Sequence, residues 1–576
     1  MVNVTIDGIN LTVPEGTTVL EAARSVGINI PTLCFLKDIN EIAACRICVV
    51  EVEGFDKLIA ACNSVLEDGM VIHTNSRSAR KARTDNLQFI LSEHNSECTV
   101  CPRSRNCTLQ RLASDMNVHE LPYPKKIPPQ KGDPTFPLIR DYTKCIKCMR
   151  CIQVCEKVQN CNIWDVMNTS SRTTVDVSGA KSLEESGCTL CGQCITHCPV
   201  GALNARDDTY RMMDVIEDPE RITVIQVAPA IRTAWGEEFG LDPEYATVGR
   251  LADALRRIGF DYVFDTTFSA DLTIMEEAHE FLERLKDPEA KLPMFTSCCP
   301  GWIRYIKSRY PEFNSHLSTA KSPQQMFGAI AKSWYAELIG VDPSKIFSVS
   351  VMPCVAKKAE CALPTMRDAS GDPDVDLALT TRELCKLMRM MNVDPYKLEE
   401  QELDTPLGIG SGGGTIFGAT GGVMEAALRT AYYMATGSNP DPDAFKNVRG
   451  PEGWKEMEFE LNGRDMKVAV VNSLANAHKM LDLLRQGQAD YDFVEVMACP
   501  GGCVGGGGQP IHDGVELYGE RGEVLHDLDQ NMDLRFCHEN PSIKACYRNY
   551  LGSPGSERAE ALLHTDHFAW KMPDIF

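Results

Sequence analysis

The sequence predicts a multidomain protein in which α+β modules come first and an α/β domain follows. Three observations support this fold class. The chain has 576 residues, too many for one hydrophobic core. Its 25 cysteines are concentrated before residue 200. From about residue 209, apolar strand-like segments alternate with amphipathic helical segments, which is the pattern of an α/β domain.

The first module, predicted at 1–78, begins with a β-hairpin. Residues 2–13 alternate between apolar and polar around an Asp7-Gly8 turn, and Thr18 with Glu21 forms a capping box that opens a helix. A hairpin followed by a helix indicates a β-grasp fold. The module carries four thiols that resemble a plant-type 2Fe-2S site, although the first gap is ten residues where that pattern has four. Zinc is the alternative for this set: Cys34, Cys45, Cys48 and Cys62.

The second module, predicted at 79–125, contains "HNSECTVCPRSRNC" with His94, Cys98, Cys101 and Cys107. Three thiolates and an imidazole suit either zinc or a 4Fe-4S cluster, and the spacing alone leaves both open. The neighbouring cysteine motifs favour iron.

The third module, predicted at 126–208, follows a proline-rich connection at 121–138 and carries two C-x2-C-x2-C-x3-C motifs. This is the spacing of a two-cluster 4Fe-4S ferredoxin, in which the fourth cysteine of each motif binds the other cluster. Zinc favours separated pairs of ligands, so iron is the better interpretation. The predicted sets are Cys145, Cys148 and Cys151 with Cys198, and Cys188, Cys191 and Cys194 with Cys155.

The α/β domain is predicted at 209–520, and a tail of two helices at 521–576. Three predicted strands, "RITVIQVAP", "KIFSVSVMP" and "DFVEVMACP", each end in a turn with proline, cysteine or both. Ligands of open α/β sheets collect at the carboxyl ends of strands. We therefore expect the functional site at these turns.

Charge and hydropathy exclude several classes of partner. The formal net charge of −22 repels nucleic acid, and no apolar run reaches the roughly 18 residues of a membrane span. The start of the chain does not read as a signal peptide, so we expect a cytoplasmic protein whose thiols are reduced and available to metals. The basic stretch Arg77 to Arg83 is typical of a solvated helix face. The alternative is that this stretch docks an acidic electron carrier.

The α/β domain supplies cysteines in three motifs, "TSCCPGW", "MPCVAKKAE" and "MACPGGCVGGGGQP". At these motifs the sequence resembles the FeFe-hydrogenases, in particular the large modular clostridial type and the catalytic subunits of NAD(P)-linked bacterial enzymes. The resemblance covers essentially the whole chain. It implies an H-cluster whose 4Fe-4S part is held by Cys299, Cys354, Cys499 and Cys503. Cys503 would also bridge to a diiron subsite that carries CO, cyanide and an azadithiolate.

The resemblance also implies a proton path to that site. Glu277, Glu280 and Arg284 share one helix face at i, i+3 and i+7, a pattern that by itself is typical of a solvated ion-pair face. In the family the two acids, with Ser318, carry protons to the thiol next to the cluster ligand, here Cys298. The resemblance further places four residues at the cofactor: Lys357, Met352, Pro229 and Gln324.

The expected activity is reversible interconversion of 2H+ and 2e- with H2, with electrons delivered through one 2Fe-2S and three 4Fe-4S clusters. Expected partners are ferredoxin, NAD(P)H-linked flavoprotein and iron-sulfur subunits, and maturation enzymes. An electron-transfer subunit related to complex I would lack the three motifs, and a cluster-assembly protein would keep cysteines there but need neither "TSCCPGW" nor "MPCVAKK". A hydrogen sensor, which would use the same cofactor with little turnover, is the remaining alternative; its mark would be a regulatory module, and the sequence shows none. Five thiols have no assigned role: Cys161, Cys361, Cys385, Cys537 and Cys546.

Overall fold

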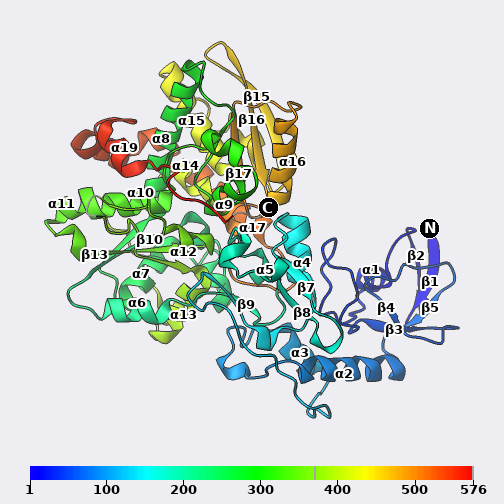
Figure 1. Cartoon of the computed structure of the whole chain (residues 1–576). Coiled ribbons are helices and arrows are strands. Elements are labelled where there is room, and N and C mark those ends of the chain that lie inside the picture. Colours follow the sequence, from blue (N-terminus) through cyan, green and yellow to red (C-terminus); the bar gives the residue numbers. More distant parts are fainter. Residues whose placement is uncertain (369–370, 574–576) are drawn as a thin grey trace. The chain divides into compact units, whose positions relative to one another are not determined.

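The computed structural model describes residues 1–368 and 371–573, so the last three residues of the predicted tail lie outside the described chain. The chain forms two compact units (Figure 1). The first contains Met1–Val158, Asn162–Leu183 and His197–Asn204, and the second contains Gln159–Cys161, Glu184–Thr196 and Ala205–Phe576. No helix among the described residues is long and apolar enough to span a membrane.

The first unit opens with the predicted hairpin, and the structure confirms it. The hairpin belongs to a five-stranded sheet of order β2-β1-β5-β3-β4. Asp7 and Gly8 both have positive φ, at 46° and 84°, as a two-residue hairpin turn requires. The predicted capping box of Thr18 and Glu21 is also present. The strands are β1 (Val2–Ile6), β2 (Ile9–Val13), β3 (Val49–Val52), β4 (Ile59–Ala60) and β5 (Val71–His73).

Short helices and strands joined by turns build the rest of the first unit. Its basic helix α2 is not solvated throughout, because Arg83 is buried and donates to the carbonyls of Val49 and Thr74. The elements are α1 (Val19–Ser25), α2 (Arg77–Ser92), α3 (Thr108–Asp115), β6 (Leu138–Arg140), α4 (Arg150–Gln153), β7 (Trp164–Met167) and β8 (Thr174–Val177), with β9 (Leu203–Ala205) at the unit boundary.

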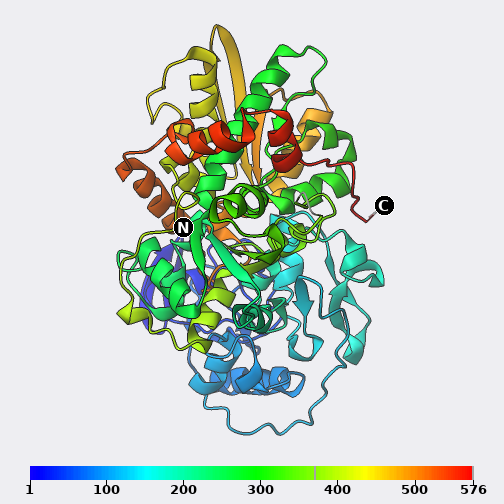
Figure 2. The ribbon, with the colours of Figure 1, turned by 90° about the vertical axis from the view of Figure 1, so that its left-hand side faces the viewer.

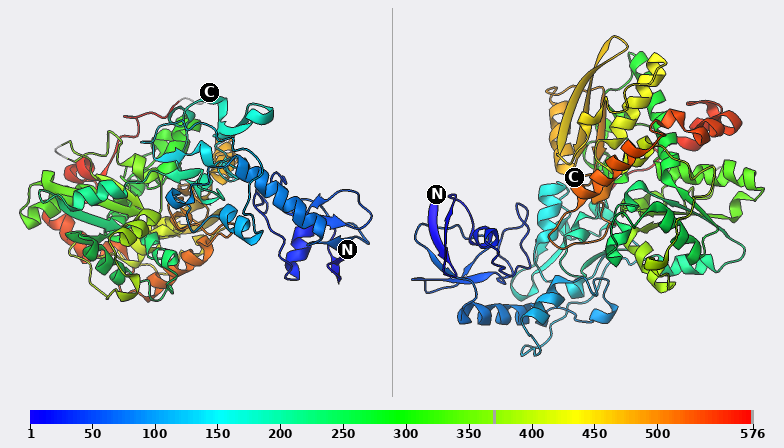
Figure 3. Two further views of the ribbon diagram at one scale, coloured as in Figure 1. Left: turned by 90° about the horizontal axis from the view of Figure 1, so that it is seen from below. Right: turned by 180° about the vertical axis from the view of Figure 1, so that it is seen from behind.

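The second unit contains two four-stranded sheets, ordered β11-β10-β13-β14 and β12-β17-β16-β15. Pairing is parallel except between β15 and β16, which form a long antiparallel hairpin (gold in Figure 3). The predicted strands are present, but they divide between the sheets. The strands are β10 (Ile222–Val227), β11 (Tyr262–Asp265), β12 (Met294–Phe295), β13 (Ile346–Met352), β14 (Leu377–Thr380), β15 (Trp454–Leu461), β16 (Arg464–Asn472) and β17 (Phe493–Met497).

Helices cover these sheets, and α8 packs against α10, α14 and α15. The helices are α5 (Gln193–Thr196), α6 (Thr209–Ile216), α7 (Val248–Ile258), α8 (Thr266–Lys286), α9 (Pro300–Arg309), α10 (Pro323–Ile330), α11 (Ala336–Ile339), α12 (Ala356–Glu360), α13 (Thr381–Met390), α14 (Gly412–Thr415), α15 (Gly422–Thr436) and α16 (Leu474–Arg485).

The C-terminal part adds three helices where the sequence predicted two. They are α17 (Tyr518–Asn531), which begins before the predicted boundary, α18 (Pro541–Cys546) and α19 (Glu557–Leu563). The last two, orange to red in Figure 2, lie along the second unit, with α18 against α8 and α19 against α10.

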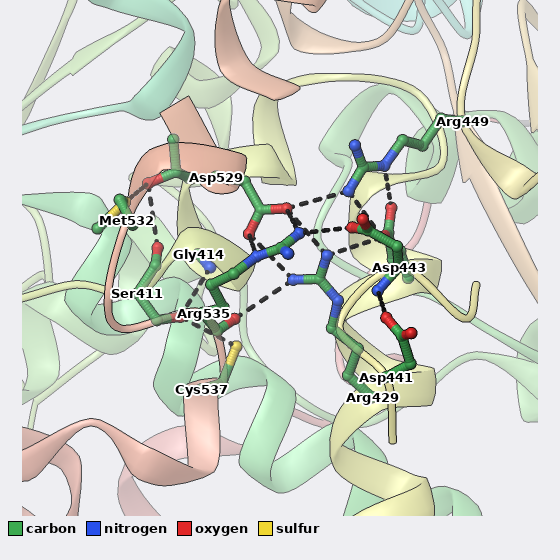
Figure 4. Close-up of polar contacts among 12 residues, drawn as sticks. Ser411, Gly414, Arg429, Asp441, Asp443, Arg449, Asp529, Met532, Arg535 and Cys537 are labelled. Atoms are coloured by element: carbon green, nitrogen blue, oxygen red, sulfur yellow. Dashed lines mark hydrogen bonds and ion pairs between the residues drawn. The ribbon is translucent and has the colours of Figure 1, made fainter. Parts of the chain in front are cut away.

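A buried ionic cluster anchors this C-terminal part (Figure 4). Asp529 of α17 is fully buried and accepts from three arginines: Arg429 at 2.9 Å, Arg449 at 3.0 Å and Arg535 at 2.7 Å. Glu425 also pairs with Arg429 and Arg449. A buried charge without a partner is strongly destabilising. The cluster therefore ties α17 firmly to α15.

Candidate active site

The predicted cofactor cysteines meet at the carboxyl ends of three strands in the second unit. Cys299 follows β12 and caps α9, Cys354 follows β13, and Cys499 follows β17. Cys503 begins a short 3-10 helix on the glycine-rich loop after β17. All four, together with Cys298, line one cavity. Its wall also includes the other predicted cofactor contacts: Pro229, Gln324, Met352 and Lys357.

The loop that carries Cys503 depends on glycine. Gly502 has φ of +89°, which residues with a Cβ rarely adopt. A Cβ on Gly506 would lie 2.1 Å from the carbonyl oxygen of Pro353, next to Cys354. The glycines thus let two cysteine-bearing segments approach more closely than side chains would allow.

The four cysteines fit an iron-sulfur cluster. Cys499 is buried and the other three are half-buried, and they act on one another electrostatically. Burial and the neighbouring Cys299 raise the pKa of Cys354 to about 11. Thiolates bind metals, so these sulfurs need positive charge close by, which iron supplies. Apolar residues such as Ala228, Phe417 and Ala498 line much of the remaining wall, which suits a bulky inorganic group.

A buried cation lies beside the cavity. Lys357 of α12 donates to the carbonyl of Cys298 at 3.1 Å and to Glu360 at 3.0 Å. Burial alone would lower the pKa of Lys357, but the Glu360 carboxylate outweighs it and raises that pKa. Lys357 is therefore charged at neutral pH.

Sequence reasoning missed Glu360, which organises this wall of the cavity. Its carboxylate accepts from Lys357, from Ser322 at 2.9 Å and from Gln324 at 2.9 Å. Ser350 in turn donates to Gln324 at 2.7 Å. The signal was present in "MPCVAKKAE", because Glu360 stands three residues after Lys357 and shares its helix face.

The acidic residues of α8 form a chain that leads toward Cys298. Arg284 donates to Glu280 at 2.6 Å, and Ser318 donates to the other oxygen of Glu280 at 2.7 Å. Ser318 also reaches Glu277, which in turn acts electrostatically on Cys298. The structure thus brings all five residues together. Glu277 is fully buried, so this helix face is not the solvated ion-pair face that the pattern alone favoured.

Burial sets the protonation of the inner end of this chain. It raises the pKa of Glu277 to about 8, and the neighbouring Glu280 charge adds to the effect. Burial, followed by the charge on Glu277, also raises the pKa of Cys298 well above its usual range. Both groups therefore carry a proton at neutral pH. Among the described residues, Glu277 Oε2 has no hydrogen-bond partner, which leaves it open to a proton or a water.

The first unit gathers the predicted 2Fe-2S thiols. Cys34 interacts with Cys45, and Cys48 interacts with Cys62. Cys34 and Cys45 also interact electrostatically with Cys62. In the same unit, Cys148 and Cys151 interact with Cys145 and Cys198, the first of the two predicted 4Fe-4S sets. The second set draws Cys155 from the first unit and Cys188, Cys191 and Cys194 from the second, and it stays a prediction.

His94 is prepared as a metal ligand. Its Nδ1 bonds to the carbonyl of Lys144 at 3.0 Å. A carbonyl only accepts, so Nδ1 carries the proton and Nε2 keeps its lone pair for a metal. Cys101 and Cys107 lie close enough to interact, and Lys125 interacts with Cys98. Among the described residues, no three His, Cys, Asp or Glu side chains are placed to bind one metal ion.

The five thiols without a predicted role are all buried. Cys361 lies near the site, 3.4 Å from the Gln324 amide, while Cys385 contacts the carbonyl of Trp235 and does not line the cavity.

The chain matches five known families in order along its length. The longest match, at residues 221–507, is to the C-terminal domain of the iron-only hydrogenase large subunit. The others are a 2Fe-2S iron-sulfur cluster binding domain (1–77), the iron-sulfur binding region of NADH-ubiquinone oxidoreductase-G (83–122), a 4Fe-4S dicluster domain (144–202) and the iron hydrogenase small subunit (515–570).

Full-length relatives have the same organisation. The NADP-reducing hydrogenase subunit HndD of Solidesulfovibrio fructosivorans is 45% identical over 99% of both chains, and iron hydrogenase 1 of Clostridium pasteurianum is 40% identical over 98% of this chain and 99% of its own. The cytosolic iron-sulfur assembly component 3 of Bos taurus is 32% identical over 68% of this chain and 86% of its own.

A solved FeFe-hydrogenase from Chlamydomonas reinhardtii superposes with a TM-score of 0.57 at 39% identity, and the match covers 64% of this chain and all of that one. With the five thiols at one cavity and full-length relatives, these matches show that the chain belongs to the FeFe-hydrogenase family, the iron-only oxidoreductases of hydrogen metabolism.

Proposed function

We propose that the chain catalyses the reversible reaction 2H+ + 2e- to H2 at an H-cluster. One observation carries the proposal: four cysteines from three strand ends line the same cavity as Cys298, and a chain of acids leads to that fifth thiol. The iron-sulfur assembly relative matches only 68% of this chain, whereas the NADP-reducing hydrogenase subunit matches 99% of it, which favours a hydrogenase.

The residues of the cavity have separate tasks. Cys299, Cys354, Cys499 and Cys503 would hold the cubane, and Cys503 would also hold the diiron subsite. When bound, the H-cluster with its CO, cyanide and azadithiolate ligands supplies the redox chemistry. Lys357 would contribute positive charge that balances the negative cyanide ligands, and Met352, Pro229 and Gln324 form part of the cavity wall.

Proton delivery follows from the hydrogen-bonded chain. Arg284 orients Glu280 at the outer end, and the Ser318 hydroxyl passes a proton between Glu280 and Glu277. Glu277 is protonated at neutral pH and can therefore donate to Cys298 and be refilled from Ser318. Cys298 holds the proton at the edge of the cavity.

Electrons arrive through the N-terminal clusters, which we assign as one 2Fe-2S and three 4Fe-4S clusters on the cysteines named above. The external partner is a ferredoxin or an NAD(P)H-linked flavoprotein with its iron-sulfur subunits. The NADP-reducing relative, similar over its full length, supports the second of these. We further propose a cytoplasmic location, which suits both partners.

The test of this function is production of the chain with and without hydrogenase maturation enzymes under anaerobic conditions. Matured protein should evolve hydrogen from a reduced artificial donor. Protein made without these enzymes should carry the N-terminal clusters and show no turnover, because no amino-acid side chain can supply CO, cyanide or the dithiolate. Lack of activity in fully matured protein would refute the proposal.

The Glu277→Gln variant should lose about a hundredfold or more in hydrogen evolution, because an amide cannot carry a proton along the chain. In the parent, activity should fall above about pH 8, where Glu277 ionises and ceases to donate. The matched control is Glu283→Gln, an exposed acid on the same helix that pairs with Lys286. Parent-like activity and pH dependence in Glu277→Gln would count against the path.

A further inference from the structure

The side chain of Asn40 joins the ligand segments of two predicted clusters in the first unit. Its Nδ2 donates to the carbonyl of Cys34 at 2.7 Å and to the carbonyl of Cys148 at 3.0 Å. Cys34 belongs to the 2Fe-2S set and Cys148 to a 4Fe-4S set. Asn40 and Cys148 are 108 residues apart in sequence, so folding alone brings them together. One amide group thus connects a ligand of each cluster.

The connection is rigid and dry. Asn40 has no exposed surface. Asn40 lies in a tight turn. Its backbone N donates to the Leu36 carbonyl at 2.8 Å, and the backbone N of Leu36 donates to the Asn40 carbonyl at 3.1 Å. An asparagine amide nitrogen has two donor hydrogens, and here both are used on cysteine carbonyls. The group therefore has little freedom to move away from either cluster.

Arg150 adds a second link between the same segments. Its Nε donates to the carbonyl of Cys34 at 3.2 Å, and its Nη2 donates to the carbonyl of Phe35 at 3.0 Å. Arg150 directly precedes the predicted ligand Cys151 in the chain. An electrostatic interaction also joins Cys34 to Cys148. Bonded routes between the two cluster sites thus start at Cys34 and run through Asn40 or Arg150.

Electrons tunnel more readily along covalent and hydrogen bonds than across van der Waals gaps of the same length. The route runs from the Cys34 carbonyl through the Asn40 amide to the Cys148 carbonyl, and it contains no such gap. A residue that only held the two segments together could donate a hydrogen bond to any nearby backbone carbonyl. Lys157 does so when it donates to the Ile39 carbonyl at 2.7 Å. Asn40 instead uses the two carbonyls that belong to cluster ligands.

We propose that Asn40 is a positioning residue for electron transfer between the 2Fe-2S site and the site of Cys145, Cys148, Cys151 and Cys198. The inference rests on the proposed function, which assigns these cysteines to clusters. One electron leaves the reduced 2Fe-2S cluster, which is oxidised, and enters the 4Fe-4S cluster, which is reduced; during hydrogen uptake the direction reverses. Asn40 transfers no proton, because its amide does not ionise.

The test uses the full chain with its clusters in place and the Asn40→Leu variant, which keeps the volume and removes both donors. After laser-flash injection of one electron, time-resolved absorption follows its exchange between the 2Fe-2S and 4Fe-4S clusters. We expect a several-fold slower exchange, with iron content and the electron paramagnetic resonance signals of both clusters retained. If Asn40→Leu loses a cluster, Asn40→Ala decides, since it removes both donors and places no bulky side chain against the two carbonyls.

The matched control is Lys157→Met, which removes a hydrogen bond to the residue next to Asn40 without touching a ligand carbonyl. Its exchange rate should equal that of the parent. An unchanged rate in Asn40→Leu, or equal slowing in Lys157→Met, would overturn the inference. A wrong cluster assignment can be distinguished from a wrong role for Asn40, because the parent itself would then lack one of the two electron paramagnetic resonance signals. In that case the inference would also be wrong.

Discussion

The Cys298→Ala variant is expected to retain its full iron content and to lose about 10²- to 10⁴-fold in hydrogen turnover, the range associated with loss of a proton-transfer group. Cys298 and Cys299 both line the cavity, yet only Cys299 is assigned to the cluster. Cys298 is 7% exposed and lies within electrostatic reach of Glu277. Its removal should therefore break proton delivery and leave the metal sites intact.

The control for this prediction is Cys385→Ala. Cys385 is also a buried thiol, but it contacts the carbonyl of Trp235 and does not line the cavity. Both variants lose a buried sulfur, and both should melt at somewhat lower temperature. Only Cys298→Ala should lose turnover. Parent-like hydrogen evolution by Cys298→Ala, with iron content verified, would show that another group delivers the proton.

The Asp529→Asn variant is expected to lower the free energy of unfolding by about 3–5 kcal/mol, the cost of breaking a buried ion pair on one side. Three arginines share this carboxylate (Figure 4). Asparagine would leave Arg429 and Arg449 with Glu425 as their remaining acidic partner, and Arg535 with Asp443. Thermal unfolding followed by circular dichroism measures the loss, with Glu312→Gln as the control. Glu312 pairs with Arg485 at the surface, where a pair contributes less than about 1 kcal/mol.

The stability difference should depend on pH in a defined direction. Burial opposes ionisation of Asp529, but hydrogen bonds from Arg429 and Arg535 prevail and hold its pKa at about 2. The stabilisation is therefore present above the ordinary aspartate pKa and is lost as the pH falls toward 2. The parent and Asp529→Asn should differ fully at neutral pH and converge in acid. An equal difference at pH 7 and pH 2 would contradict this account.

Local sequence signals predicted much of the fold. The alternation of residues 2–13, the Asp7-Gly8 turn and the Thr18 capping box depend on contacts a few residues apart, and all three are present. The apolar strands of the α/β domain are present for the same reason. Their division between two sheets could not be predicted, because sheet membership depends on partners far away in sequence, such as the two-residue strand β12.

The candidate site shows the same division between local and distant information. Glu360 was visible at i+3 from Lys357, but its contacts with Ser322 and Gln324 come from another helix and its preceding turn. Asn40 carried no signal at all, since its importance arises from a carbonyl 108 residues away. The pattern on α8 suggested a solvated face because charges recur at helical spacing. The helix packs against α10, α14 and α15, so Glu277 is buried and the side chains of Glu280 and Arg284 are only 14% and 15% exposed.

The most direct test of the account is infrared spectroscopy of the matured, active protein. CO and cyanide bound to iron absorb in a region where polypeptide does not, so the bands report the diiron subsite itself. The account predicts these bands in matured protein that evolves hydrogen, and their absence from protein made without maturation enzymes. An active preparation with no carbonyl or cyanide bands would contradict the assignment of Cys299, Cys354, Cys499 and Cys503 to an H-cluster.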